Sequence, residues 1–436
     1  MSVPIPVNAV AADVGDTFDR LWSELLPIGR SSSGGYRRFA WNDADLAARS
    51  WFSSAASARG LDVQTDRNGN LWAWWLPTGW SGEPRDAFVS GSHLDSVPDG
   101  GAFDGPLGVV SALCAIGVLR SRGVQPLRPI AVVVFADEEG ARFGVACAGS
   151  RLATGALEPS AARGLTDIDG VSLDDAMRRA GVDTTQLGRD DETLRRVGVF
   201  VELHIEQGQA LVDLDAPLGI GTSIWPHGRW RFSFEGEANH AGTTRMTDRR
   251  DPMLPFAAAV IAARILATKQ GGVATFGRVH VQPNGTNAIP SSVTGWLDAR
   301  GPDQAVVDAI VSGVSANAHA RAAAERVELA VTAESVSAVV EFSADANARL
   351  HRVLDSVAGV GPVVGVGRVP DLGTGAGHDA GVLSSMVPTA MLFVRNPTGV
   401  SHSPTEFAER ADCLVGVEAL AAVMADWVST PPVEAS

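Results

Sequence analysis

Two different patterns of apolar and polar residues follow each other along the chain. In the first pattern, short continuous apolar runs alternate with segments of helical periodicity, and the runs lie at 87–90, 130–136, 197–203 and 389–394. Continuous apolar strands separated by helices are typical of a mainly parallel sheet that is covered on both faces. This part of the chain is therefore predicted to form an α/β domain in which helices flank the sheet.

The helices of this domain are predicted from their periodicity and from the signals at their ends. Helical periodicity runs through residues 15–60. The clearest helix is Leu107–Arg122, because Pro106 suits a first helical turn and Gly123 lies just past the last turn.

The second pattern begins near residue 215. Arg229–Glu235, Val273–Val281 and Val293–Ala299 alternate between apolar and polar residues, and helical stretches lie between them. Strands with one solvent-exposed face, and helices packed on the other face, predict a small α+β domain. We place this domain at 215–333, inserted into an α/β domain that is made of residues 1–214 and 334–436.

Composition and charge narrow the classes of function. The chain has 436 residues, of which 45% are hydrophobic, so it can bury a large core. Its net charge is −15 and its pI is about 5.0. An acidic surface argues against nucleic acid as a partner, because phosphate binding requires a Lys/Arg footprint.

The cysteines and the N-terminal residues favour a cytoplasmic protein. Cys114, Cys147 and Cys413 are far apart among small or apolar neighbours, which predicts buried free thiols. Met1–Asp13 has neither the basic nor the apolar part of a signal peptide. No stretch reaches the ~18 uninterrupted apolar residues of a membrane span. We therefore expect a reducing cytoplasm and no membrane partner.

Potential metal ligands follow four of the apolar strands. These residues, together with one acid in a glycine-rich loop, are His93, Asp104, Glu139, His204 and His402. In an open α/β sheet, ligands bind outside the carboxyl ends of the strands. Residues far apart in the sequence are therefore expected to converge in one crevice.

This set of residue types suits divalent metal ions. Imidazole and carboxylate groups together favour zinc, manganese, cobalt or nickel. Three histidines and two acids suffice for two ions if one carboxylate bridges them, and another acid must stay unligated to accept the proton of a water. One such histidine or acid alone would more simply be a core residue or a helix cap, whereas five of them at strand ends and in a glycine loop favour a metal site.

Several motifs resemble the M20-type metallohydrolases, and they occur in that family's order between about residues 90 and 407. They are GSHLDSVPDGGAFDGPLGV, FADEEGARFGVACAGSR, ELHIEQG, GEANHAGTTRM, TNAIP, GHDAG and GVSHSP. The chain is most similar to the amidase and carbamoylase branch, which contains N-carbamoyl-L-amino acid hydrolases, β-ureidopropionases and allantoate amidohydrolases. The N-terminal GGYRRFAWNDADLAARSWF resembles the allantoate amidohydrolases in particular.

The resemblance implies a fold and a ligand set. The fold is a phosphorylase/hydrolase-like metallopeptidase domain with an inserted dimerisation (lid) domain. Two divalent ions per subunit are implied, zinc or manganese, with cobalt or nickel also compatible. His93 and His204 would bind one ion, Glu139 and His402 would bind the other, and Asp104 would bridge them.

The resemblance also implies the groups that act on water and on the first ligand. Glu138 would be the general base and is expected to be ionised until it takes the proton of a water. Asp95 would orient the imidazole of His93 through its carboxylate.

Substrate contacts are implied as well. His240 would stabilise the oxyanion, reaching across to the partner's active site in a homodimer. Asn287 and Arg300 would hold the substrate carboxylate, which the planar fork of an arginine can bind bidentately. Gln207 would contact the ureido end, and His378 would line the pocket. Closure of the inserted domain would bring Arg300 and His240 to the substrate.

Three of these residues also have simpler structural interpretations. Arg300 would form a surface ion pair with Asp298, and His240 and Asn287 would be structural residues of turns.

One segment departs from the family pattern. Members of this branch usually have Gln or Gly-Gln beside the arginine at the start of the inserted domain, whereas this chain has Trp225-Pro226-His227-Gly228 before Arg229. We expect this departure to alter the rim of the substrate site, so the resemblance does not fix the exact substrate.

Together these observations predict a metal-dependent amidohydrolase of the cytoplasm. It would cut a linear amide or ureido C–N bond in a small carboxylate substrate, allantoate or an N-carbamoyl-L-amino acid, and release ammonia and carbon dioxide. An N-acyl amino acid deacylase, or a dipeptidase or aminopeptidase of the same fold, is the alternative. A non-catalytic dimeric metal-binding protein is a more remote one.

Overall fold

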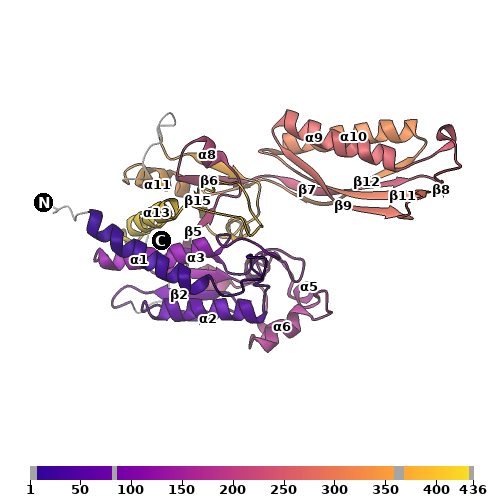
Figure 1. Cartoon of the computed structure of the whole chain (residues 1–436). Coiled ribbons are helices and arrows are strands. Elements are labelled where there is room, and N and C mark those ends of the chain that lie inside the picture. The colour runs from indigo at the N-terminus through magenta and orange to yellow at the C-terminus, as the bar shows by residue number, and fades with distance from the viewer. Residues whose placement is uncertain (1–6, 81–85, 358–367, 432–436) are drawn as a thin grey trace. The chain divides into compact units, whose positions relative to one another are not determined.

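A computed structural model describes residues 7–80, 86–357 and 368–431, and the side chains of residues 7–13 are not described (Figure 1). The first six residues of Met1–Asp13, the segment expected to lack a signal peptide, lie outside the described residues. The chain divides into two compact units. Unit 1 consists of Met1–Thr222, Phe342–Leu372 and Gly377–Ser436, and unit 2 consists of Ser223–Glu341 and Gly373–Ala376.

A nine-stranded sheet organises unit 1. Its order is β1 (Asp62–Thr65), β2 (Leu71–Trp75), β4 (Ile130–Phe135), β3 (Ala87–His93), β5 (Val197–Ile205), β15 (Thr389–Val394), β6 (Leu218–Ile224) and β13 (Val340–Glu341), and β14 (Asp371–Thr374) pairs with β6. The central strands β4, β3, β5 and β15 are parallel, and the pairs β1–β2, β2–β4, β15–β6 and β6–β13 are antiparallel. The prediction of a mainly parallel central sheet is confirmed.

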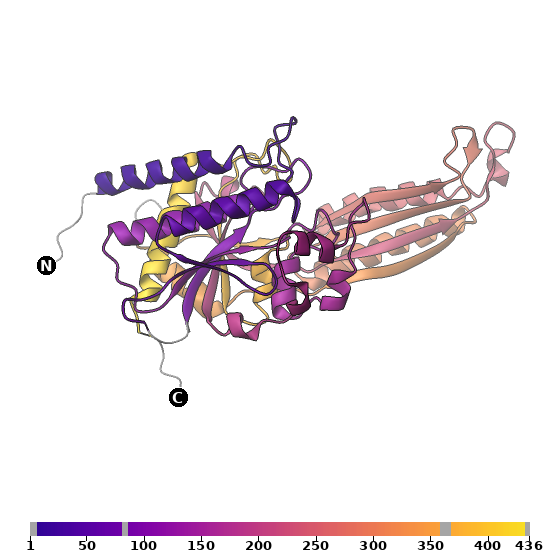
Figure 2. The same ribbon diagram turned by 90° about the horizontal axis from the view of Figure 1, so that it is seen from below.

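Helices cover both faces of this sheet, as predicted. One buried core contains residues of α1 (Val7–Leu25), α2 (Asp43–Ser57), α3 (Pro106–Ser121), α11 (Ala344–Leu354) and α13 (Arg410–Val428). Val199, Val201 and Leu203 of β5 belong to that core, so the alternate residues Phe200 and His204 point to the opposite face. In Figure 2 the twisted strands lie beneath the indigo helices.

The opposite face of the sheet carries short helices. They are α12 (Asp379–Leu383) and α4 (Ala148–Thr154), which contact each other. Four more short helices lie in the connections: α5 (Pro159–Arg163), α6 (Leu173–Arg179), α7 (Asp191–Leu194) and α8 (Ala210–Asp213). Helix α12 packs against β5, β15 and α4. The three cysteines are buried and free, as predicted.

Unit 2 contains a four-stranded antiparallel sheet. Its order is β12 (Glu328–Ser337), β7 (His227–Glu235), β11 (Ser292–Arg300) and β9 (Val273–Gln282), and β8 (Asn239–His240) pairs with β10 (Ala288–Ile289) beside it. Helices α9 (Met253–Gln270) and α10 (Gln304–Ala324) lie together on one face (Figure 1). Trp230, Phe232 and Phe234 of β7 are buried under these helices, whereas the alternate residues of β7 are more exposed.

The boundaries of unit 2 differ from those that the sequence predicts. The unit begins at Ser223 rather than at 215, because residues 218–221 of β6 still pair with β15 of the large sheet. It ends at Glu341 rather than at 333, because β12 continues to Ser337 beside β7. The short segment Gly373–Ala376 also belongs to unit 2, and no local pattern in the sequence signals it.

By length and composition, α9 is the one helix in the described part of the chain that is long and apolar enough to cross a membrane. A core helix passes the same test. Phe256, Ala259 and Ala263 of α9 pack into the core of unit 2, so packing within the unit accounts for part of its apolar composition.

Candidate metal centre

The four strands that precede the predicted ligands are neighbours in the sheet. His93 ends β3 and is aligned with Phe135, the last residue of β4. His204 lies near the end of β5 and is aligned with Phe393 of β15. Because β4, β3, β5 and β15 are parallel, their carboxyl ends meet at one edge, where the loops that follow converge.

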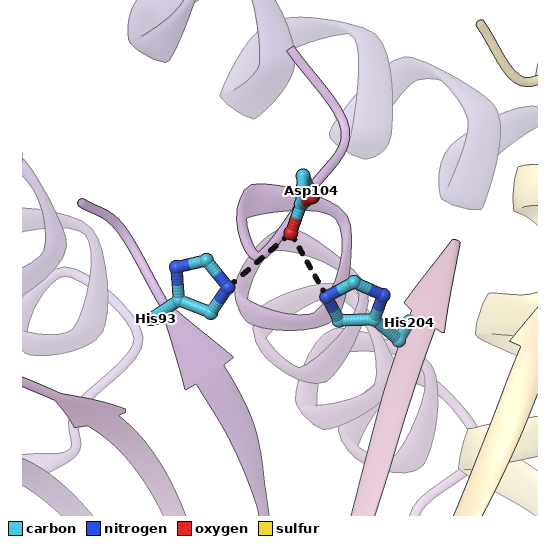
Figure 3. A group of neighbouring side chains, drawn as sticks. All are labelled: His93, Asp104 and His204. Carbon is cyan, nitrogen blue, oxygen red and sulfur yellow. Dashed lines mark ion pairs between the residues drawn. The ribbon is translucent and has the colours of Figure 1, made fainter. Parts of the chain in front are cut away.

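The first ligand group consists of His93, Asp104 and His204. The Nε2 atoms of His93 and His204 lie 3.4 Å and 3.2 Å from the same oxygen, Oδ1 of Asp104. Figure 3 shows both rings pointing at this oxygen from neighbouring strands. All three side chains are buried. Gly105 follows with a φ of +82°, and a Cβ there would lie 2.5 Å from the His93 ring, so the position requires glycine.

The second ligand group uses the other oxygen of Asp104. Nε2 of His402 lies 3.4 Å from Oδ2 of Asp104 and 3.7 Å from Oε2 of Glu139. His402 has a φ of +54°, which non-glycine residues seldom adopt, and its side chain is half exposed. Asp104 thus presents one oxygen to each group, as a bridging carboxylate does.

Hydrogen bonds on the far side of both buried rings test whether these residues fit a metal ion. Nδ1 of His93 lies 3.1 Å from the Asp95 carbonyl, and Nδ1 of His204 lies 2.9 Å from the Ile205 carbonyl. A carbonyl only accepts, so each Nδ1 carries a hydrogen, and each ring in its neutral, metal-binding form would direct the lone pair of Nε2 at Asp104.

The other side of each ring supports the same fit. Among the residues that the structure describes, neither Nε2 atom has a hydrogen-bond partner. Two ligand atoms that are each about 2.1 Å from a tetrahedral ion lie about 3.4 Å apart. The distances to Asp104 match that spacing, so the residues fit a divalent cation.

The charges of the site, in the protein chain alone, also call for a cation. Burial raises the pKa of Glu138 well above its usual value, and burial together with Asp104 raises the pKa of Glu139 to about 7. The contact with Asp104 raises the pKa of His402 to about 9. Burial by itself would lower the pKa of His93, but Glu138 and Asp104 raise it well above its usual value. Bound positive charge would relieve this crowding of carboxylates.

Glu138 lies beside the two ligand groups without belonging to either. Its Oε2 atom is 3.7 Å from Nε2 of His93. Its Oε1 atom accepts a hydrogen bond from the thiol of Cys147 at 3.3 Å. One carboxylate oxygen is thereby held by the protein while the other faces the ligands.

Asp95 lies beside the His93 ring, as expected, and also contacts the turn that carries the acid pair. Its Oδ1 atom is 3.7 Å from Nδ1 of His93, and the imidazole instead donates to the backbone carbonyl of Asp95. The Asp95 carboxylate accepts the backbone N–H groups of Glu138 at 3.1 Å and of Glu139 at 3.0 Å. The Asp95 carboxylate therefore shapes the turn that carries Glu138 and Glu139, and the backbone carbonyl of Asp95 orients His93.

Gln207 and His378 both contact the ligand groups. Gln207 donates to Oδ2 of Asp104 at 2.9 Å, and its buried Oε1 atom has no partner among the described residues. His378, which was predicted to line the pocket, is 3% exposed, and its ring packs against His204 with centroids 4.5 Å apart. Burial, together with His204, lowers the pKa of His378 well below its usual value.

The other predicted substrate residues belong to unit 2, so the cluster in unit 1 contains none of them. His240 is aligned with Ala288 in the β8–β10 pair, and Ala288 directly follows Asn287 in the sequence. Both His240 and Asn287 are exposed. Arg300 ends β11, donates to both oxygens of Asp298 at 2.8 Å and 3.2 Å, and donates to the Gly375 carbonyl at 2.6 Å. The ion pair with Asp298 that the sequence allowed is present.

Sequence reasoning missed two residues that contact this site, Ser401 and Glu406. Ser401 accepts a hydrogen bond from Gln207 at 3.1 Å, and the Glu406 carboxylate accepts the backbone N–H of Asp104 at 2.9 Å. The available signal was an acid four residues after His402 in the same loop.

Comparison with known proteins yields one family and a consistent group of relatives. A family model described as "Peptidase family M20/M25/M40" matches residues 89–426. The chain is 37% identical to an N-carbamoyl-L-amino acid amidohydrolase of Geobacillus stearothermophilus, over 92% of this chain and 96% of that protein. It is 31% identical to an allantoate amidohydrolase of Escherichia coli (strain K12), over 93% of this chain and 97% of that protein.

Solved structures agree with these relatives. A hydantoinase/carbamoylase family amidase from Burkholderia multivorans superimposes with a TM-score of 0.84 at 30% identity, covering 96% of this chain and 98% of that chain. The aminopeptidase PepT from Bacillus cereus has a TM-score of 0.60 at 16% identity, covering 95% and 99% of the two chains, and so shares the fold alone.

Proposed function

The chain belongs to peptidase family M20/M25/M40, and from that premise we propose that it is an amidohydrolase that cuts a ureido C–N bond in a small carboxylate substrate. The observation that carries the proposal is the pair of ligand groups that share Asp104, with Glu138 unligated beside them. The relatives named for N-carbamoyl amino acids and for allantoate favour this chemistry over an N-acyl amino acid deacylase or a peptidase.

The proposed cofactors are two divalent ions per subunit. His93, His204 and Asp104 would hold one ion, and Asp104, Glu139 and His402 would hold the other. Zinc or manganese suits these ligands, and cobalt or nickel is compatible. Such ions supply Lewis-acid polarisation of a carbonyl and a positive charge that acidifies water.

Glu138 carries the proton in the proposed mechanism. The carboxylate removes a proton from water, and the oxygen of that water attacks the ureido carbonyl. Glu138 then returns the proton to the leaving nitrogen, and the carbamate product breaks down to carbon dioxide and ammonia. The thiol of Cys147 holds Oε1, which leaves Oε2 directed toward the reacting atoms.

The proposed substrate contacts follow from groups that have hydrogen-bonding capacity left. The buried Oε1 of Gln207 would accept a ureido N–H. Arg300 would bind the substrate carboxylate, because its contacts with Asp298 and Gly375 use three of the five guanidinium N–H groups. His240 would donate to the oxyanion.

The positions of these groups within unit 2 support a homodimer with shared sites. The nine residues of β11 span about 26 Å at about 3.3 Å per residue, with Arg300 at one end. His240 and Asn287 lie beyond the other end, so a small substrate cannot contact both sets within one unit. The proposal therefore assigns His240 and Asn287 to the partner's active site. The exposed Leu254, Ile261 and Ile265 of α9 are apolar surface that a partner would cover.

The segment that departs from the family pattern places His227 beside Arg300, and we propose that this histidine contacts a second ureido group, as allantoate would offer. Arg300, His227 and Ser337 are directly aligned across β11, β7 and β12, so their side chains lie in one row on the same face. Nδ1 of His227 donates to the Trp225 carbonyl at 3.1 Å, which makes Nε2 an acceptor when the ring is neutral. Arg300 would donate to a carboxylate, and Nε2 of His227 beside it would accept an N–H group. This pair suits allantoate, whose central carbon carries a carboxylate and two ureido groups.

The proposed setting is the cytoplasm, with no nucleic acid or membrane partner. The acidic composition supports the exclusion of nucleic acid as a partner.

The test measures ammonia released from allantoate, N-carbamoyl-L-methionine and N-carbamoyl-β-alanine, and acetate released from N-acetyl-L-methionine. Chelated protein is compared with protein resupplied with Mn²⁺. Metal-dependent ammonia from a ureido substrate is expected. Acetate without ammonia would make the chain a deacylase, and no product from any substrate would favour the non-catalytic alternative.

A further inference from the structure

Glu406 is a buried carboxylate that binds the backbone of the Asp104 loop. The residue is 4% exposed. Its Oε1 atom accepts the backbone N–H groups of Phe103 and Asp104, each at 2.9 Å. These are consecutive N–H groups, so one carboxylate oxygen fixes the backbone at the residue that would bridge the two ions.

The same carboxylate belongs to the loop that carries His402. The backbone N–H of Glu406 donates to the Ser403 carbonyl at 3.0 Å, which closes a turn directly after His402. Oγ of Ser401 lies 3.4 Å from Oε2 of Glu406 and 3.3 Å from Oδ2 of Asp104. Glu406 therefore connects two ligand loops that are about 300 residues apart in the sequence.

The glycine-rich loop is shaped to receive this carboxylate. A Cβ on Gly101 would lie 2.3 Å from Oε1 of Glu406 and 2.4 Å from its Cβ, so only glycine leaves room for the side chain. The ligand distances do not involve Glu406, which is not a member of either ligand group. Its contacts are all with the segments that carry the ligands.

We propose that Glu406 is a positioning residue that holds the Asp104 and His402 loops in register for the ion shared by Asp104, Glu139 and His402. The inference rests on the proposed metal centre. Without Glu406, the backbone N–H groups of Phe103 and Asp104 lose their acceptor, and ion binding itself must order the two loops. Loss of such an outer contact typically weakens metal binding about 10- to 100-fold.

The test is titration of chelator-treated protein with Mn²⁺ by calorimetry. Wild-type protein is expected to bind two ions per chain. Glu406→Ala should bind the ion shared by Asp104, Glu139 and His402 at least tenfold more weakly, and should weaken the other ion less, because His93 and His204 lie on β3 and β5. Glu406→Gln should stay close to wild type, because the amide oxygen can accept the same two N–H groups. Glu406→Asp keeps the charge, withdraws the oxygens by one methylene, and should weaken binding of the shared ion even if the alanine variant does not fold.

A matched control is Asp167→Ala. Oδ1 of Asp167 also accepts two backbone N–H groups, from Asp169 at 3.0 Å and from Val171 at 2.8 Å, but no predicted ligand lies in that turn. This variant should bind both ions as wild type does. The inference is overturned if Glu406→Ala retains both affinities, or if the two alanine variants lose affinity equally. Wild-type protein that binds no Mn²⁺ would overturn the proposed metal centre itself.

Discussion

At the scale of single residues, the proposed metal centre depends on which side-chain atoms have no hydrogen-bond partner. The backbone carbonyls of Asp95 and Ile205 take the Nδ1 hydrogens of His93 and His204, so the Nε2 lone pairs converge on Asp104. Glu138 is excluded from both ligand groups but lies 3.7 Å from His93. In the proposed mechanism, ligation by Glu139 and proton transfer by Glu138 would thereby be divided between neighbouring residues of one turn.

This division predicts the effect of replacing the base. Glu138→Gln removes the proton acceptor and leaves every ligand in place, so Mn²⁺ binding should be unchanged. The turnover number should fall about 100- to 10,000-fold, the range of general-base contributions. Ammonia release and calorimetric Mn²⁺ titration check this on one preparation. Turnover near the wild-type value would show that another group accepts the proton.

A second residue-scale prediction concerns pH. In the metal-free chain the pKa of Glu139 is raised to about 7 and that of His402 to about 9, so the folded state binds more protons than the unfolded state between about pH 5 and 9. Their contribution to stability is therefore present at low pH and lost as pH rises through these values. Binding of metal requires both groups deprotonated, so Mn²⁺ affinity should rise over the same interval.

Thermal melts of chelated protein check the sign of this effect. The midpoint should be lower at pH 9 than at pH 6, and the rise produced by saturating Mn²⁺ should be larger at pH 9. A chelated protein that melts at a higher temperature at pH 9 would contradict the assigned pKa shifts.

At the scale of elements, the start of α3 joins packing to ligation. Helix α3 begins with Pro106, and its N-cap residue is Gly105, which has a φ of +82° and whose missing Cβ leaves room for the His93 ring. Asp104 does not cap the helix, because its carboxylate is directed at three histidines instead.

Gly105→Ala should therefore damage the first ligand group. A Cβ in this backbone conformation is strained by about 1–3 kcal/mol, and it would also displace the His93 ring. We expect at least tenfold weaker binding of the ion held by His93, Asp104 and His204. Gly117 lies in the same helix with no atom within 4 Å of an added Cβ, so Gly117→Ala should stabilise the helix by about 0.5–1 kcal/mol and leave Mn²⁺ titration unchanged. Equal effects of the two substitutions would remove the role given to Gly105.

A second element-scale prediction uses the row of Arg300, His227 and Ser337 across three strands of unit 2. Glutamine at 227 lacks the ring that the Trp225 carbonyl holds in one tautomer. His227→Gln should lower kcat/KM for allantoate about three- to tenfold, the value of one hydrogen bond, and leave that for N-carbamoyl-L-methionine nearly unchanged. A parallel loss on both substrates would mean that His227 only supports the strand.

At the scale of the whole molecule, the sequence predicted what depends on local signals. The apolar runs that lead to His93, Glu139 and His204 are buried strands, and the predicted ligands come together because parallel strands end at one edge. The sequence could not predict contacts between segments that are distant along the chain. Glu406 on the Asp104 loop and Gly373–Ala376 in unit 2 have no local periodicity, so only the folded chain brings them together.

The last prediction concerns the proposed homodimer. Arg300 and the pair of His240 and Asn287 lie at opposite ends of β11, so one substrate can use both only if they come from different chains. His240→Ala and Glu138→Gln variants should each be nearly inactive alone. In a mixed dimer, the chain with intact Glu138 receives an intact His240 from its partner, so one of the two sites works. Random pairing of equal amounts makes half of the dimers mixed, and co-expression should restore about a quarter of wild-type activity. If His240 served its own chain, each chain would carry its own defect and the mixture would stay inactive.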